Sequence, residues 1–258
     1  HNLLCENQFG FRPQHSCETA LLCMVDQWSM NVDKGCLNGI AFVDLRRAFD
    51  TVDHSLLLEK LARYGCSTEA IAWFTSYLKN RTQYVSIGKE KSMCRNVSVG
   101  VPQGSILAPM LFTLFINDMP DSVSNGTIHM YADDTTVSVS GKTKDEVENN
   151  LTQALQEIFV WLKRNKLILN TDKTKLMLLG STQKLNRIDD KHLKVFVNDH
   201  CIENVYEYKC LGLVIDHCLN FRAHTESIAK TVKQKLGTLR RIRNYFTHNK
   251  WKYYIGDM

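Results

Sequence analysis

Short runs of apolar and β-branched residues predict most of the strands of this chain. Residues 39–45 predict a buried strand that delivers Asp44 at its C-terminal end. Residues 129–139 hold two such runs, separated by Asp133 and Asp134, and predict a β-hairpin with both carboxylates at its tip. Further strands are predicted over residues 84–87, 176–179, 194–197 and 209–215.

Apolar residues at helical spacing predict helices between these strands. Asp53 can cap one helix and Gly65 can end it, while the next begins after Ser67. A buried helix follows Pro109, a position near a helix start where proline costs little. Two more helices are predicted. One begins at a capping box over residues 143–146. The other carries the apolar repeat Ile228, Val232, Leu236 and Leu239.

The elements predict one mixed α+β unit in which several strands converge, with no internal repeat or linker. The 258 residues are 44% hydrophobic, enough for a sizeable core. The longest apolar run, residues 106–116, is about half the roughly 20 residues that a membrane span needs, so no membrane is expected. Nine cysteines without a CxxC pair favour a reduced, intracellular protein, and the group Cys201, Cys210, His217 and Cys218 has the wrong spacing for a metal site.

Charge is unevenly distributed along the chain. The net charge is +5, and residues 222–258 hold nine Lys or Arg against Glu226 and Asp257. Such a segment suggests a polyanionic partner, although a solvated helix face would have the same composition.

The three carboxylates suggest metal chemistry. A strand end and a hairpin tip are both places where a sheet presents side chains to solvent, so Asp44 could meet Asp133 and Asp134. Clustered carboxylates repel one another unless cations or raised pKa values relieve them, and hard oxygen ligands select Mg²⁺ or Mn²⁺. Two ions about 3.5 to 4 Å apart support in-line phosphoryl displacement. Alone, the pair Asp133-Asp134 would also fit an ordinary acidic turn.

The carboxylates lie in two motifs of a known family. Residues 42–45, Phe-Val-Asp-Leu, with Ala-Phe-Asp at 48–50 resemble the first palm motif of reverse transcriptases. Residues 131–134, Tyr-Ala-Asp-Asp, resemble their catalytic signature. That tetrapeptide arises by chance about once in several hundred chains of this length.

Four further motifs occur in the family's order. Residues 100–105, Gly-Val-Pro-Gln-Gly-Ser, with the stretch 109–118 are similar to the central motif of non-long-terminal-repeat (LINE-type) retrotransposons. The others are Gln-Phe-Gly-Phe-Arg-Pro at 8–13, Asn170 with Lys173-Thr174, and residues 208–212. The chain is therefore identified as resembling the reverse transcriptase domain of such an element over nearly its whole length.

The resemblance implies the palm of a right-hand polymerase, an antiparallel sheet backed by helices, with partial fingers and a partial thumb. Residues 39–66 and 97–216 would form the palm. Partial fingers would comprise residues 1–38 and 67–96, and residues 217–258 would start the thumb. In the family, a fingers hairpin with Lys and Arg that bind the triphosphate precedes the segment where this chain begins, so we expect an N-terminally truncated domain.

The resemblance also implies site residues. Asp44, Asp133 and Asp134 would bind two Mg²⁺ ions, with Mn²⁺ as an alternative, and Lys173 would donate a proton to pyrophosphate unless Lys175 does so. Simpler interpretations are a core side chain for Phe49, a plain turn for Gly104 and a solvated loop lysine for Lys173. The expected nucleotide-binding residues are Leu45, Phe49, Gln103 and Gly104. The expected primer or template contacts are Tyr208, Lys209, Cys210, Leu211, Gly212, Lys230 and Lys233.

The implied function is RNA-directed DNA synthesis from a primer 3′-hydroxyl. The implied partners are an RNA template, a DNA primer, deoxynucleoside triphosphates and, in a ribonucleoprotein, the element RNA; the family acts in cytoplasm and nucleus. A viral RNA-dependent RNA polymerase fits less well, because that class has Gly-Asp-Asp and a polar residue in place of Phe49. A decayed, non-catalytic remnant that binds nucleic acid is the second alternative.

Overall fold

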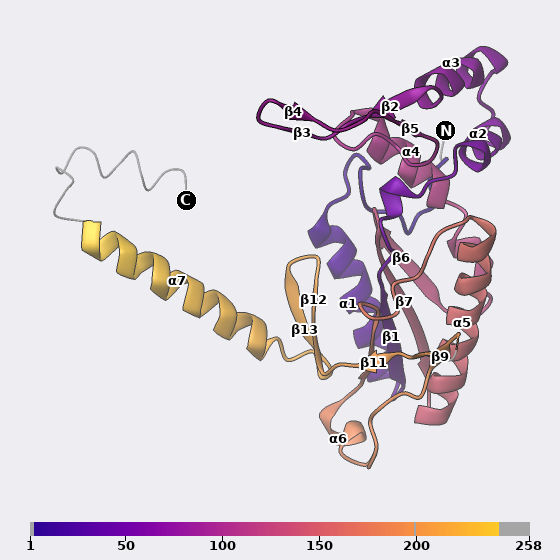
Figure 1. The fold of residues 1–258 in the computed structure, drawn as a ribbon. Helices are drawn as coiled ribbons and strands as arrows, with labels where there is room; N and C mark the ends of the chain where they lie inside the picture. The colour runs from indigo at the N-terminus through magenta and orange to yellow at the C-terminus, as the bar shows by residue number, and fades with distance from the viewer. Residues whose placement is uncertain (1–2, 199, 243–258) are drawn as a thin grey trace.

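A five-stranded sheet forms the centre of the molecule, as the computed structural model shows for residues 3–198 and 200–242 (Figure 1). The strand order is β11-β8-β1-β7-β6, and only the pair β11 and β8 is parallel. The strands are β1 (Leu37–Val43), β6 (Thr127–Tyr131), β7 (Asp134–Gly141), β8 (Lys175–Leu179) and β11 (Glu203–Asn204). The predicted mixed α+β class is confirmed.

Both faces of the sheet are covered, which explains why every residue of β1 is buried. Ala41 and Val43 join the core cluster formed with α5 (Lys144–Arg164) and α4 (Leu107–Ile116). Ile40 and Phe42 join a second cluster with α1 (Cys17–Asp33). Because side chains alternate along a strand, Asp44 follows Phe42 onto the α1 face.

The predicted helices carry the caps that the sequence suggested. Asp53 and Ser67 accept hydrogen bonds from the first turns of α2 (His54–Arg63) and α3 (Thr68–Leu78). Gly65 follows α2 with a φ of 87°, as expected of a helix-ending glycine. Thr143 caps α5 by accepting from the Glu146 amide, but the Glu146 carboxylate accepts from the Lys142 amide and not from the Thr143 amide, so only half of the predicted capping box forms.

The chain between α3 and α4 forms a long arm that projects from the molecule and is separate from the central sheet (Figure 1). It pairs β2 (Arg81–Gln83) with β5 (Arg95–Val97), and β3 (Ser86–Ile87) with β4 (Glu90–Lys91). The strand predicted over residues 84–87 is therefore partly wrong, because only its second half is extended in a ladder.

The segment after β8 contains short elements. They are α6 (Thr182–Leu185), β9 (Phe196–Val197), β10 (His200–Cys201), β12 (Glu207–Cys210) and β13 (Leu213–Asp216). The single strand predicted over residues 209–215 is wrong: Leu211 and Gly212 both have positive φ and turn the chain back into a β12–β13 hairpin. Of the predicted strand 194–197, only the last two residues pair.

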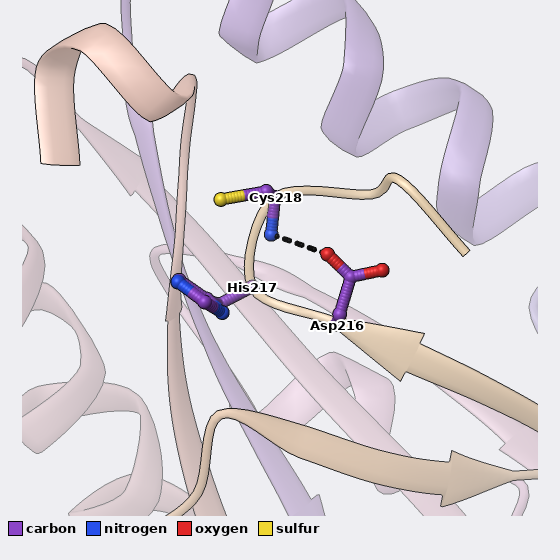
Figure 2. Close-up of side chains that lie close together, drawn as sticks. All are labelled: Asp216, His217 and Cys218. Atoms are coloured by element: carbon purple, nitrogen blue, oxygen red, sulfur yellow. Dashed lines mark hydrogen bonds between the residues drawn. The ribbon is translucent and has the colours of Figure 1, made fainter. Parts of the chain in front are cut away.

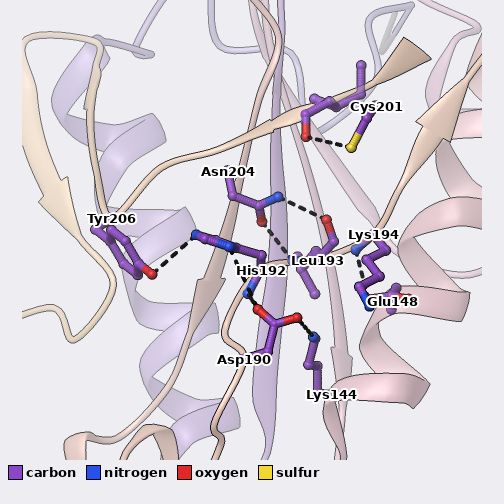
Figure 3. A network of polar contacts seen from close by, with 10 residues as sticks. Lys144, Glu148, Asp190, His192, Leu193, Lys194, Cys201, Asn204 and Tyr206 are labelled. Atoms are coloured by element: carbon purple, nitrogen blue, oxygen red, sulfur yellow. Dashed lines mark hydrogen bonds and ion pairs between the residues drawn. The ribbon is translucent and has the colours of Figure 1, made fainter.

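A polar network holds residues 190–194 against α5 and joins them to residues 204–206 (Figure 3). Asp190 accepts from the His192 amide at 3.0 Å and lies 3.4 Å from the Lys144 ammonium. Asn204 makes two hydrogen bonds with the backbone of Leu193, at 2.8 and 2.9 Å. These contacts supplement the two-residue ladders of β9 with β10 and of β11 with β8.

Two helices show where the sequence pattern was incomplete. Helix α1 was not predicted, because exposed Leu22 and Met30 obscure its buried row of Ala20, Met24 and Trp28. Helix α7 (Arg222–Ile242) was predicted, but Ile228, Val232 and Leu236 on it remain 48–51% exposed. It projects away from the sheet (Figure 1). The basic residues beyond position 242 and the rest of the proposed thumb start lie outside the described residues.

The remaining elements are the short 3₁₀ helices η1 (Ala48–Asp50) and η2 (Pro120–Ser122). Among the helices of the described residues, none combines the length and the apolar character needed to cross a bilayer.

Candidate active site

Three carboxylates meet at one end of the sheet. Tyr131 pairs with Asp134, so Ala132 and Asp133 form a two-residue turn between β6 and β7. Val43 pairs with Thr135, and continuing this register by one residue places Asp44 opposite Asp134. The predicted hairpin with carboxylates at its tip is confirmed, and the register brings Asp44 next to Asp134.

The electrostatics of the three groups agree with this geometry. Although Asp134 as a residue is exposed, partial desolvation of its carboxyl, followed by repulsion from Asp133 and Asp44, raises its pKa. Within the described ranges, the carboxylates of Asp133 and Asp134 accept no hydrogen bond. Free, mutually repelling carboxylate oxygens are the donor set that suits a hard divalent cation.

Asp44 is held in place by the loop that precedes β8. Asn170 donates from its side-chain amide to Asp44 Oδ1 at 2.9 Å and from its backbone to the Asp44 carbonyl, also at 2.9 Å. The Thr174 hydroxyl accepts from the Asp44 amide at 3.3 Å. One carboxylate oxygen is thus oriented, and Oδ2 has no hydrogen-bond partner among the described residues.

A pocket of about 370 Å³ opens beside Asp133. All four residues expected to bind a nucleotide line it: Leu45, Phe49, Gln103 and Gly104. The structure therefore gathers them in one place, next to one of the carboxylates.

Phe49, Gly104 and Gln103 differ in how the rest of the chain holds them. The Phe49 ring stacks on Phe112 with centroids 4.2 Å apart, so it belongs to the core edge and also lines the pocket. Gly104 has a φ of 82°, and a Cβ there would meet no atom within 4 Å, so its conformation requires glycine while the space before it is open. Gln103 donates to the Asp50 carboxylate at 2.7 Å.

The pocket also contains a cation that the sequence did not identify. Arg47 lines it, and in the described part of the chain its guanidinium has no hydrogen-bond or ion-pair partner. Its neighbour Arg46 instead lies 3.4 Å from the Asp172 carboxylate. The only sequence feature that could have identified Arg47 is the Arg-Arg pair two residues after Asp44.

The two candidate lysines differ in their contacts. Lys175 donates to the Asp172 carbonyl at 2.6 Å and pairs with Glu203 at 2.5 Å. Lys173 is exposed and has no polar partner within the described ranges. Lys173 is therefore the one with an available ammonium group.

The β12–β13 hairpin lies near the carboxylates. Tyr208 stacks on Phe42 with centroids 3.9 Å apart. Desolvation raises the pKa of Tyr208, with smaller contributions from Cys210, Asp134 and Asp44. Burial likewise raises the pKa of the Cys210 thiol to about 11, so this cysteine packs as a neutral core residue.

The other expected primer or template residues occupy different surroundings. Lys209 is exposed, and Leu211 and Gly212 form the hairpin turn. Lys230 and Lys233 line a shallow depression on α7, which contacts β13 and extends away from the sheet (Figure 1). The structure does not bring these two lysines to the carboxylates.

A second group of ligand-type side chains follows β13. The donor atoms of Asp216, His217 and Cys218 lie within 4.8 Å of one another (Figure 2). Both oxygens of Asp216 are already used: Oδ1 accepts from the amides of Cys218 and Asn220, and Oδ2 accepts from the Phe221 amide at 2.7 Å. This buried aspartate therefore fixes the turn that leads into α7.

Comparisons with known proteins agree on the type of fold. The family model described as "Reverse transcriptase (RNA-dependent DNA polymerase)" matches residues 1–215. The RNA-directed DNA polymerase from mobile element jockey of Drosophila funebris is 30% identical over 236 residues, which cover 89% of this chain and 25% of the relative. Its counterpart in Drosophila melanogaster is 29% identical over 239 residues, covering 90% and 25%. The chain thus spans about a quarter of the length of these relatives.

Solved structures show a similar fold at low sequence identity. Apo telomerase from Candida tropicalis, truncated from its C-terminal domain, superposes with a TM-score of 0.57 at 14% identity, covering 83% of this chain and 40% of that one. Telomerase from Candida albicans, solved in complex with a fragment of telomeric RNA, gives a TM-score of 0.53 at 12% identity, covering 83% and 35%.

Proposed function

The chain belongs to the reverse transcriptase (RNA-dependent DNA polymerase) family, and we propose that it is the catalytic core with which a retrotransposon protein copies RNA into DNA. The single observation that carries the proposal is the meeting of Asp44, Asp133 and Asp134 beside a pocket lined by all four expected nucleotide-binding residues.

Asp44, Asp133 and Asp134 would hold divalent cations, and their oxygen-only ligand set favours two Mg²⁺ ions, with Mn²⁺ as a substitute. Bound there, the ions supply activation of the primer 3′-hydroxyl and stabilisation of the leaving pyrophosphate. Asn170 orients Asp44 through Oδ1, so Oδ2 would be available to a cation. Lys173 would donate the proton that pyrophosphate needs, because its ammonium group is available and that of Lys175 is paired.

The pocket would hold the incoming nucleotide. Gly104 leaves room for the nucleotide to approach the backbone, and Gln103 offers polar contacts. The Phe49 ring, fixed against Phe112, would exclude a ribose 2′-hydroxyl by steric contact. Leu45 would contact the nucleotide through its backbone, and Arg47 would bind its phosphates.

The nucleic acid would extend from this pocket across the β12–β13 hairpin. Tyr208, Lys209, Cys210, Leu211 and Gly212 would support the primer end, with Tyr208 fixed on Phe42 and Cys210 in the core. Lys230 and Lys233 on α7 would contact phosphates without sequence preference. The partners would be an RNA template, a DNA primer and deoxynucleoside triphosphates, with the element RNA in a ribonucleoprotein.

In this proposal the central sheet with its helices is the palm, formed by residues 39–66 and 97–216. Residues 1–38 and 67–96 contribute to the fingers, so the projecting arm belongs to them. Residues 217–258 begin the thumb with α7.

The test uses the full-length protein with an RNA template and a DNA primer. We expect Mg²⁺-dependent incorporation of deoxynucleotides by the wild type and its loss in Asp133→Asn. Equal incorporation by both proteins would contradict the proposal. Salt-dependent binding of the primer–template without incorporation by the wild type would favour the non-catalytic alternative.

A further inference from the structure

The segment before α1 packs directly against the turn that carries the carboxylates. Gln8 forms a parallel bridge with Met130 in β6. The Phe9 amide donates to the Met130 carbonyl at 2.8 Å, and the Met130 amide donates to the Asn7 carbonyl at 2.9 Å. Residues 7–9 therefore extend the sheet beyond β6. They pair with Met130, which lies two residues before Ala132.

The side chain of Gln8 reaches the turn itself. Gln8 is completely buried, and its Oε1 accepts from the Gly10 amide at 2.8 Å and from the Ala132 amide at 3.4 Å. Two N–H donors fix the orientation of the carboxamide, because the reverse orientation would place its NH₂ group against both of them. Nε2 is buried without a partner among the described residues.

Ala132 needs such support because of its conformation. Its φ is 56°, in the left-handed region that an alanine seldom adopts. It is the first residue of the two-residue turn, and Asp133 follows it directly. A change of φ at Ala132 toward negative values would rotate the peptide bond between Ala132 and Asp133. It would therefore move the side chains of both Asp133 and Asp134.

Gly10 makes the close approach of this segment possible. A Cβ at position 10 would lie 2.4 Å from the Ala132 nitrogen and 3.0 Å from the Tyr131 carbonyl carbon, both backbone atoms that cannot move away without displacing the turn. Only glycine allows residues 8–10 to lie this close to it. Gln8 and Gly10 thus contact the backbone of the turn, whereas Asp133 and Asp134 themselves are exposed.

We propose that Gln8, packed through Gly10, is a positioning residue that holds Ala132 in its left-handed conformation and thereby sets the geometry of Asp133 and Asp134 for divalent metal binding. The role rests on the proposed function, in which these carboxylates bind the metal. Glutamine suits position 8 because its uncharged oxygen accepts from the Ala132 amide. A carboxylate there would add a fourth negative charge near Asp44, Asp133 and Asp134.

The test compares three variants of the full-length protein. Gln8→Met keeps the size but removes the acceptor. Gln8→Glu keeps an acceptor, because complete burial favours its neutral, protonated form. Gln27→Met is the matched control: it removes a glutamine hydrogen bond of 2.8 Å to Thr127, at the other end of β6.

Two readouts are taken for each variant. The first is Mn²⁺ affinity, measured by the electron paramagnetic resonance of free Mn²⁺, which does not require catalysis. The second is the Mg²⁺ concentration that gives half-maximal nucleotide incorporation. We expect Gln8→Met to weaken both by about tenfold, which corresponds to about 1.4 kcal/mol. The nucleotide KM at saturating Mg²⁺ should stay unchanged, Gln8→Glu should recover most of the loss, and Gln27→Met should match the wild type.

Wild-type metal affinity in a folded Gln8→Met would overturn the inference, as would equal losses in Gln8→Met and Gln27→Met. If Gln8→Met does not fold, Ala132→Gly is added to it, because glycine adopts positive φ without support. We expect the double variant to fold and bind Mn²⁺, and its failure to fold would also overturn the inference. Mn²⁺ binding without incorporation by the wild type would instead contradict the proposed function alone.

Discussion

Two groups of potential metal ligands lie in the part of the chain that the structure describes, and our proposal assigns a metal to only one of them. Asp44, Asp133 and Asp134 meet at the end of the sheet, and the pKa of Asp134 is raised by desolvation and by the other two carboxylates. The donor atoms of Asp216, His217 and Cys218 lie within 4.8 Å of one another (Figure 2), but both oxygens of Asp216 accept hydrogen bonds from three backbone amides.

The comparison shows that proximity of ligand atoms is a weaker criterion than the state of those atoms. A carboxylate that already accepts three N–H bonds is stabilised less by a cation than carboxylates that repel one another without hydrogen-bond donors. A cation would therefore relieve the repulsion among Asp44, Asp133 and Asp134. Asp216 instead stabilises the turn that leads into α7. Three predictions test this distinction and a fourth tests the adjoining pocket, in order of decreasing expected effect.

Asp44→Asn should reduce nucleotide incorporation by at least about a hundredfold, because it removes a charge that the two-metal mechanism requires. The amide keeps an oxygen for Asn170, so the fold should be retained. Single-nucleotide incorporation at saturating Mg²⁺ and nucleotide measures the effect. Asp216→Asn is the counterpart in the other group, and it should incorporate at a rate close to that of the wild type. Similar losses in both variants would remove the distinction between the groups.

Asp216→Ala should lower the free energy of unfolding by about 2 to 3 kcal/mol, because three backbone amides lose a charged acceptor. Metal affinity should not change. Thermal unfolding with and without Mg²⁺ measures both quantities in one experiment. A fall in metal affinity without a fall in stability would show that Asp216 is a ligand after all.

Arg47→Ala should raise the KM for deoxynucleotides by about tenfold, the loss expected when one charge-assisted contact to a phosphate is removed. The maximal rate should change less. Arg46→Ala is the matched control, since Arg46 is engaged with Asp172 and should leave KM nearly unchanged. Steady-state kinetics with the nucleotide varied distinguish the two. An equal rise in KM for both would mean that the pocket responds to net charge and not to Arg47.

Asp134→Asn should stabilise the metal-free protein slightly, by less than about 1 kcal/mol after allowance for solvent screening. The pKa of Asp134 is raised in the folded state, so the folded protein binds this proton more tightly than the unfolded chain. Stability is therefore present at low pH and is lost as the pH rises through the raised pKa.

The asparagine variant lacks that loss, so its advantage should grow with pH and disappear in acid. Added Mg²⁺ should reverse the sign and favour the wild type. Unfolding midpoints test the prediction when they are measured, with and without Mg²⁺, from acid pH to pH values above the raised pKa of Asp134. A pH-independent difference would mean that neither desolvation of the Asp134 carboxylate nor repulsion from Asp133 and Asp44 is its cause.

Local sequence signals predicted the parts of the site that local structure determines. Asp44 ends an apolar strand, and Asp133 and Asp134 separate two strand-forming runs, so both positions followed from periodicity. The caps Asp53, Ser67 and Thr143 likewise act within a single turn of helix. In each case the residue and its consequence lie within a few positions of one another.

The sequence could not predict features that depend on distant contacts or on unusual backbone conformations. Gln8 acts on Ala132 across 124 positions, and Arg47 gained significance only once the pocket was assembled. The β12–β13 turn was missed because Leu211, a residue that rarely has positive φ, occupies it together with Gly212. The pattern of α7 predicted its helix but not that its apolar stripe would remain half exposed.

The most direct test of the account is a count of bound Mn²⁺ on the full-length protein, with a primer–template and a non-reactive deoxynucleotide analogue present. The account predicts that the wild type binds Mn²⁺, that Asp134→Asn loses most of this binding, and that Asp216→Asn retains it. Unchanged binding in Asp134→Asn, with loss in Asp216→Asn, would contradict the assignment of the metal site to the end of the sheet.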